Sequence, residues 1–171
     1  MKKQTKNLIT SIVVIAVIAG GGFGLMSLGN KSGTTNFSIY SASALVAYED
    51  HFDFGTIQMN DGLVRHEFEV KNEGTESVTI GKVYTSCMCT GAYIEDSTGK
   101  KYGKFGMPGH GVSSQTEISV APGETVMVEA IFDPAAHGPS GVGLAQRSIY
   151  IETNSQTSPK IELAFEATVT R

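Results

Sequence analysis

Residues 64–71 read Val64-Arg65-His66-Glu67-Phe68-Glu69-Val70-Lys71. Apolar residues and His66 occupy every second position, and charged residues fill the positions between them. Because successive side chains of a β-strand point to opposite faces, this alternation predicts a half-buried strand. The same two-residue pattern recurs at residues 126–133, 149–152 and 160–169.

Turn-forming residues separate these runs. Asn72-Glu73-Gly74 closes one run, and Ala121-Pro122-Gly123-Glu124 fits a type II turn. A shorter run at residues 78–83 is interrupted by Gly81, which indicates a β-bulge. No stretch after Asn30 shows a helical period. About seven short strands separated by turns predict an all-β fold, an antiparallel sandwich.

Composition excludes several classes of protein. Hydrophobic residues make up 40% and charged residues 18% of the 171 residues, which is too apolar for a disordered chain. The 13 basic and 17 acidic residues give a net charge of −4, which argues against a nucleic-acid partner. The 2 cysteines allow at most one internal disulfide, so the fold is not a disulfide scaffold.

The N-terminal segment predicts a single membrane-spanning helix. Residues 8–28 carry no charge and are long enough to cross the hydrocarbon core of a bilayer. Lys2, Lys3 and Lys6 precede this span and place the N-terminus in the cytoplasm. The alternative is a cleaved signal peptide, for which Ala42-Ser43-Ala44 supplies a small-x-small site well past the apolar run.

This assignment divides the chain into three parts. We expect residues 1–29 to form the cytoplasmic lysine tail and the membrane anchor, and residues 30–44 to form a flexible linker rich in Ser, Thr, Asn and Gly. Residues 45–171 then form the extracytoplasmic β domain.

Several short motifs, taken in order, resemble one protein family. They are Phe52-Asp53-Phe54-Gly55-Thr56-Ile57, Val70-Lys71-Asn72-Glu73-Gly74, Thr85-Ser86-Cys87-Met88-Cys89-Thr90, Ala121-Pro122-Gly123-Glu124, Phe132-Asp133 and Glu152-Thr153-Asn154. In this order and spacing, residues 45–171 resemble the bacterial domain-of-unknown-function family fifteen-seventy-three. That family is related to the immunoglobulin-like modules of the ASPM/SPD-2/Hydin and major sperm protein type.

The resemblance implies an immunoglobulin-like sandwich on exported envelope proteins, and it implies no enzyme activity. This chain departs from the family in two places. Met88 stands where the family usually has Gly between the two cysteines, and residues 91–119 form a longer link to the Pro-Gly turn.

The two cysteines have three alternative interpretations. As a disulfide they need a bend, because residues i and i+2 of a straight strand have Cα atoms about 6.6 Å apart, near the upper limit for a disulfide. As small apolar residues they pack between the sheets. As thiolates they bind a soft metal, copper or zinc. The candidate metal ligands are Cys87, Cys89, Met107, His110 and His137, with Met88 as a further soft donor.

Catalytic motifs are missing from the sequence. It contains no Gly-x-Ser-x-Gly elbow and no phosphate-binding glycine loop. We therefore predict a non-enzymatic module, anchored in the membrane, that binds another envelope protein or has a structural role in the cell envelope. The alternative is a soft-metal-binding domain that uses the Cys, His and Met set, and the sequence indicates no other cofactor.

Overall fold

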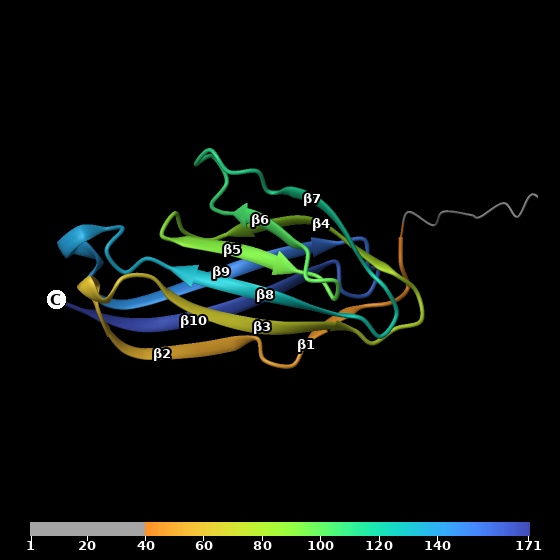
Figure 1. Cartoon of the computed structure of the whole chain (residues 1–171), viewed down its shortest axis with the longest axis horizontal. Coiled ribbons are helices and arrows are strands. Elements are labelled where there is room, and N and C mark those ends of the chain that lie inside the picture. Colours follow the sequence, from red (N-terminus) through yellow and green to blue (C-terminus); the bar gives the residue numbers. More distant parts are fainter. Residues whose placement is uncertain (1–39) are drawn as a thin grey trace, which may run out of the picture. The chain divides into compact units, whose positions relative to one another are not determined.

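The computed structural model describes residues 40–171. The predicted membrane-spanning segment and most of the predicted linker therefore lie outside the described residues. Within residues 40–171, no helix has the length and apolar character needed to cross a bilayer. The described region is an all-β sandwich of two sheets that pack face to face (Figure 1).

Each sheet contains five strands. The first sheet has, in spatial order, β1 (Leu45–Ala47), β3 (Val64–Asn72), β8 (Thr125–Phe132), β5 (Thr90–Glu95) and β6 (Lys101–Phe105). The second sheet has β2 (His51–Gln58), β10 (Lys160–Thr170), β9 (Gly143–Thr153), β4 (Val78–Thr85) and β7 (Gln115–Val120). Two short 3₁₀ helices, η1 (Met59–Asp61) and η2 (Gly138–Gly141), lie in connections between strands.

The predicted strands are all present, and the predicted sandwich is confirmed. The run at residues 64–71 lies in β3, and the bulge expected at Gly81 appears as a register shift between Ile80 and Lys82 in β4. The expectation of about seven strands was too low, because residues 40–171 contain ten. Three of these are the short strands β1, β6 and β7, each at the edge of a sheet.

The expectation of a purely antiparallel sandwich was also wrong at one strand pair. β2 pairs with β10 in parallel, whereas every other strand pair in the described region is antiparallel. The cause is the crossing between β1 and β2. The chain leaves the edge of the first sheet after Ala47 and joins the edge of the second sheet at His51, beside the last strand.

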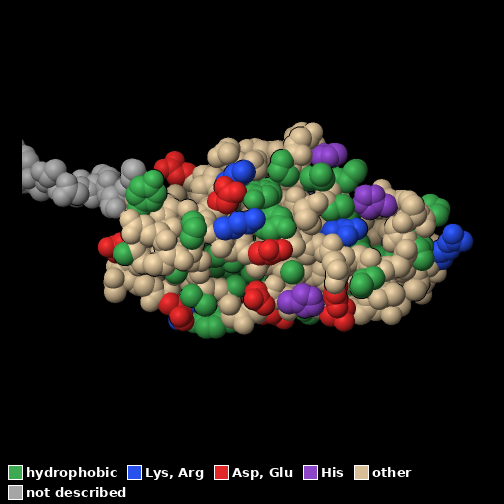
Figure 2. Space-filling model, turned by 180° about the vertical axis from the view of Figure 1, so that it is seen from behind, with side chains coloured by type: hydrophobic (Ala, Val, Ile, Leu, Met, Phe, Trp, Pro, Cys, Tyr) green, Lys and Arg blue, Asp and Glu red, His purple; other side chains and the backbone are tan. Residues whose placement is uncertain are grey.

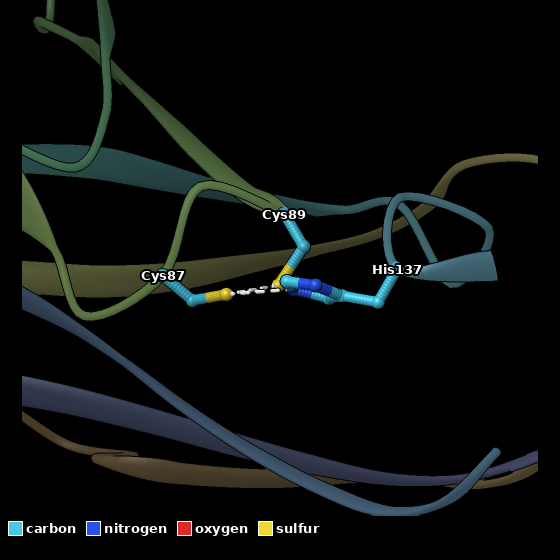
Figure 3. A group of neighbouring side chains, drawn as sticks. All are labelled: Cys87, Cys89 and His137. Carbon is cyan, nitrogen blue, oxygen red and sulfur yellow. Dashed lines mark hydrogen bonds between the residues drawn. The ribbon is translucent and has the colours of Figure 1, made fainter. Parts of the chain in front are cut away.

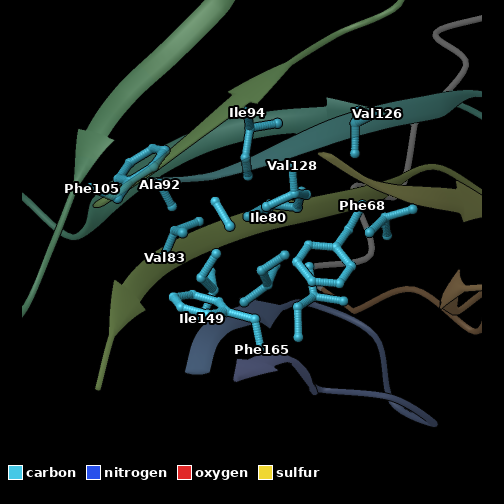
Figure 4. Close-up of a cluster of buried hydrophobic side chains, with 14 of the residues drawn as sticks. Phe68, Ile80, Val83, Ala92, Ile94, Phe105, Val126, Val128, Ile149 and Phe165 are labelled. Carbon is cyan, nitrogen blue, oxygen red and sulfur yellow. The ribbon is translucent and has the colours of Figure 1, made fainter. Parts of the chain in front are cut away.

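The core lies between the two sheets and comes from the inward side of the alternating strands (Figure 4). Phe68, Val126 and Val128 from the first sheet face Ile149 and Phe165 from the second, and all are fully or almost fully buried. Burying a side chain of this size contributes roughly 1.5–3 kcal/mol. Acidic and basic side chains are interspersed on the outer surface shown in Figure 2.

The folded region begins before residue 45. The Ser41 N–H donates to the Asn154 carbonyl (2.9 Å), and the Ser43 hydroxyl accepts from the Glu76 N–H (2.9 Å). Both serines are buried. Residues 41–43 therefore lie against the domain, although their composition is typical of a linker, because their hydroxyl and backbone groups pair with the ends of β4 and β9.

Two connections between the sheets meet at one end of the sandwich. One joins β4 to β5 and contains both cysteines, and the other joins β8 to β9 and contains η2 (Figure 1). The Asp133 N–H donates to the Cys89 carbonyl (2.9 Å), which ties the two connections together. This end of the fold positions the candidate site.

Candidate functional site

The two cysteines lie in a tight turn between β4 and β5. The sequence had suggested that they lie on a strand. The Thr90 N–H donates to the Cys87 carbonyl (3.1 Å), which closes the turn. The buried Thr85 hydroxyl lies 3.0 Å from the Cys87 carbonyl and 3.1 Å from the Thr90 carbonyl. This bend brings the two Sγ atoms to 2.7 Å, and both cysteines are free thiols.

His137 reaches the cysteines from the connection between β8 and β9. Its Nε2 atom lies 3.2 Å from the Cys87 Sγ atom, and its carbonyl accepts a hydrogen bond from the Ser140 hydroxyl (2.7 Å). One donor atom from each of Cys87, Cys89 and His137 lies within 4.8 Å of the other two (Figure 3). We call these three residues the thiol–imidazole group.

Arg147 in β9 is a residue of the candidate site that the sequence did not predict. Its Nε–H donates to the Cys89 Sγ atom (3.1 Å), and its guanidinium lies over the Phe132 ring, 5.9 Å from the ring centroid. A signal was present in the sequence. Arg147 is two residues before Ile149 and four before Ile151, so strand alternation places it on the inward face with these core residues.

The environment splits the acidities of the two thiols. Burial alone raises the pKa of a thiol, but hydrogen bonds from Cys89 and then from His137 bring the pKa of Cys87 down to about 7. Burial, followed by the hydrogen bond with Cys87, raises the pKa of Cys89. Cys87, the more exposed of the two, therefore loses its proton first. Cys89 keeps its own proton and donates it in a hydrogen bond to the Cys87 sulfur.

An open cleft of about 500 Å³ adjoins the thiol–imidazole group. Cys87, His137 and Arg147 line it together with Val142 and Leu144, whose side chains are exposed. Cys89 is buried beneath this surface. The site thus offers two sulfur atoms and one imidazole nitrogen to a ligand that enters from the cleft.

Met107 and His110 lie in the connection between β6 and β7, where the His110 N–H donates to the Met107 carbonyl (3.3 Å). His110 does not join the cysteines: among the described His, Cys, Asp and Glu residues, only Cys87, Cys89 and His137 gather in this way. The connection between β6 and β7 also starts near the cysteine turn, since the Thr85 N–H donates to the Gly106 carbonyl (3.2 Å), but it runs on to β7 at the edge of the second sheet, whereas the connection that holds His137 leads to β9.

His66 has the structural role that its place on the apolar face of a strand predicts. Its ring stacks on Phe52 with the ring centroids 3.6 Å apart, and its Nε2 atom lies 2.8 Å from a Glu49 carboxylate oxygen. His51 is exposed at the start of β2.

Residues 45–105, which run from β1 to β6 and include the cysteine turn, match a known protein family. Its description is Protein of unknown function (DUF1573). The resemblance seen in the sequence is therefore confirmed over these residues. No curated protein matches the chain.

Several solved structures are similar to this chain. A protein of unknown function from Porphyromonas gingivalis W83 has a TM-score of 0.54 and 16% identity, covering 78% of this chain and 51% of that one. The VesB protease of Vibrio cholerae has a TM-score of 0.48 and 13% identity, covering 75% of this chain and 32% of the protease.

A PapD-like domain of human CEP192 has a TM-score of 0.44 and 13% identity, covering 85% of this chain and 97% of that domain. This chain spans about half the length of the Porphyromonas protein. At 16% identity, the likeness to that protein shows the fold alone.

Proposed function

We propose that this chain is a membrane-anchored, non-enzymatic binding module of the cell envelope, built on an immunoglobulin-like sandwich. The observation that carries the proposal is the composition of one end of the fold. Exposed apolar side chains, Val142 and Leu144, border a cleft that holds the thiol–imidazole group, and Met88 is exposed between the two cysteines. Apolar side chains around a few polar groups are typical of binding sites.

The proposed location rests on the sequence. The uncharged residues 8–28 follow three lysines and suit a membrane anchor with an extracytoplasmic domain. The experiment compares the full-length protein with a Val14→Lys/Ile15→Lys variant, and a Thr34→Lys variant serves as the control. We expect the wild type and the control to stay in alkaline-washed membranes with residues 1–29 retained by mass spectrometry, and the double variant to leave them. A mature protein that lacks residues 1–29 contradicts the anchor.

The binding role is tested by crosslinking in intact cells. Full-length wild-type protein is compared with a Val142→Asp/Leu144→Asp variant and with Val46→Asp, which changes an exposed apolar residue on β1. We expect the wild type and Val46→Asp to capture the same envelope proteins, and the double variant to lose them. Recovery of the same partners by all three proteins contradicts a binding role for this end of the fold.

Soft-metal binding is the second candidate function, and the geometry of the thiol–imidazole group favours it. Thiolate sulfur and imidazole nitrogen are ligands of copper and zinc. The test is the metal content of reduced, full-length protein. We expect close to one metal ion per chain in the wild type and in His110→Ala, and loss of metal in Cys87→Ser and His137→Ala. Absence of stoichiometric metal in the reduced wild type contradicts this function.

A further inference from the structure

Arg147 gives the thiol–imidazole group a fixed positive charge. Its Nε–H donates to the Cys89 Sγ atom at 3.1 Å, and one terminal N–H donates to the Gln146 carbonyl at 2.7 Å. No carboxylate within residues 40–171 forms an ion pair with it, whereas Arg65 pairs with Glu129 at 2.7 Å. The sulfur atoms are therefore the anionic partners of this guanidinium when they are deprotonated.

The charge of Arg147 sets the charge that the site best accepts. A metal binds cysteines as thiolates, which contribute two negative charges here. A monovalent ion together with Arg147 balances these charges, whereas a divalent ion leaves one uncompensated positive charge in a partly buried site. We propose that Arg147 makes this a site for a monovalent soft cation, Cu(I), in preference to Zn(II), an inference that rests on the soft-metal function above.

The number of ligands agrees with this choice. The described His, Cys, Asp and Glu residues supply three donor atoms and no fourth. Structural zinc sites are almost always four-coordinate, and soft thiolate ligands select Cu(I). Three protein ligands with an open position also occur in catalytic zinc sites. The ligand count alone therefore does not separate the two metals, and the charge of Arg147 does.

Metal binding requires a small movement of sulfur. Two sulfur atoms bound to one ion at about 2.3 Å lie roughly 4 Å apart, whereas the Sγ atoms of Cys87 and Cys89 are 2.7 Å apart. Cys87 is the residue that can move, because it is partly exposed and lines the cleft, while Cys89 is buried and bonded to Arg147. The ion enters from the cleft and separates the two sulfurs.

The test measures selectivity in reduced, full-length protein held in detergent. Dissociation constants for Cu(I) and Zn(II) are determined by competition with chromophoric chelators. The proteins are the wild type, Arg147→Gln, which removes the charge, and Arg147→Lys, which keeps it. Arg65→Gln is the control, because Arg65 is an exposed arginine on β3. Thermal unfolding by circular dichroism establishes that each variant is folded.

The positive charge of Arg147 repels a divalent ion twice as strongly as a monovalent ion, so its removal favours the divalent ion. We expect Arg147→Gln to lower the ratio of the Zn(II) dissociation constant to the Cu(I) dissociation constant by about tenfold or more, which means that zinc binding becomes relatively tighter. We expect Arg147→Lys and Arg65→Gln to stay within about threefold of the wild type. X-ray absorption of the copper-loaded wild type should show two sulfur ligands and one nitrogen ligand, and His110→Ala should keep all three.

The experiment distinguishes failure of the soft-metal function from failure of the role proposed for Arg147. If the reduced wild type binds neither metal stoichiometrically, the soft-metal function itself is wrong. If metal binds but the ratio is unchanged in Arg147→Gln, or the wild type prefers Zn(II), the role given to Arg147 is wrong and the metal site stands. Should Arg147→Gln fail to fold, a shift of the ratio in Arg147→Lys as large as tenfold overturns the proposal, because that variant keeps the charge.

Discussion

The Nε2 atom of His137 lies 3.2 Å from the Sγ atom of Cys87, although the two residues are 50 positions apart in the chain. One belongs to the connection between β8 and β9, and the other to the turn between β4 and β5. Both connections cross from one sheet to the other at the same end of the sandwich. The backbone hydrogen bond between Asp133 and Cys89 holds them in register.

The pKa of about 7 for Cys87 predicts its reactivity. The thiolate is the nucleophile, so alkylation by iodoacetamide should accelerate as the pH rises through about 7 and level off above it. Cys89 should react more slowly and at higher pH, because its pKa is raised and its side chain is buried. Peptide mass spectrometry of the full-length protein, alkylated for increasing times, distinguishes the two sites.

His137→Ala tests whether His137 causes this reactivity. Loss of the hydrogen bond from the imidazole should raise the pKa of Cys87 and move the midpoint of its alkylation to higher pH. His110→Ala, which changes a histidine outside the thiol–imidazole group, should leave the midpoint unchanged. An equal midpoint in the wild type and His137→Ala contradicts the contact between His137 and Cys87.

Oxidation should abolish metal binding. The turn places the two cysteine sulfurs next to each other, so a mild oxidant should join them in an intramolecular disulfide. A disulfide has no thiolate to offer a metal, so the oxidised protein should hold none, and reduction should restore binding. The measurements are free-thiol titration and metal content of the same sample. Full metal content in a sample without free thiols rules out the cysteines as ligands.

Asn72 should be important for stability. It is fully buried at the end of β3, and its side-chain amide donates to the carbonyls of Glu76 (2.8 Å) and Val120 (2.9 Å). Its side-chain oxygen accepts from the Gly74 N–H (3.0 Å). Asn72→Ala leaves these buried groups unpaired and should lower the free energy of unfolding by about 2–4 kcal/mol.

Urea denaturation measures this loss, with Asn60→Ala as the matched control. Asn60 is exposed in η1, so its replacement should change the free energy of unfolding by less than about 0.5 kcal/mol. Similar midpoints for the two variants contradict the structural role of Asn72.

Asp96 should contribute a pH-dependent part of the stability. It lies between β5 and β6, and hydrogen bonds from Thr98, Lys100 and Tyr102 lower its pKa to about 2, with the Thr98 side chain contributing most. Because the folded pKa lies below the unfolded value, the stabilisation is complete above about pH 4 and is lost as the pH falls toward 2.

We therefore expect Asp96→Asn to be less stable than the wild type at pH 7, with a difference that shrinks between pH 4 and pH 2. Thermal unfolding at several pH values measures the difference. Glu117→Gln, on the exposed side of the edge strand β7, is the control for the loss of one acidic charge. A difference between Asp96→Asn and the wild type that stays constant down to pH 2 excludes this linkage.

Much of the fold was predictable because strand alternation is a local property. The runs in β3, β8, β9 and β10 alternate so regularly that their buried faces are evident from the residues. The short edge strands β1 and β6 were not predicted, because runs of 3 and 5 residues hold too few positions to show a two-residue period. The parallel pairing of β2 with β10 was missed as well, since it depends on which sheet the chain enters after β1.

The candidate site was predictable in part. The sequence pointed to Cys87, Cys89 and His137 as donors of a suitable kind, but it gave equal standing to Met107 and His110. Arg147 was not predicted as a site residue, because a charged residue in a strand is normally assigned to the outer face. Its inward position follows from its spacing to Ile149.

The sequence by itself determined which segments alternate, where most turns fall and which residue types have donor chemistry, because each of these properties depends on neighbours along the chain. Only the tertiary structure decided that His137 joins the cysteines, that His110 does not, and that a guanidinium accompanies the sulfur atoms. The approach of His137 to the cysteines depends on which strand ends share one end of the sandwich. That is set by how the two sheets pack their apolar faces together over the whole domain.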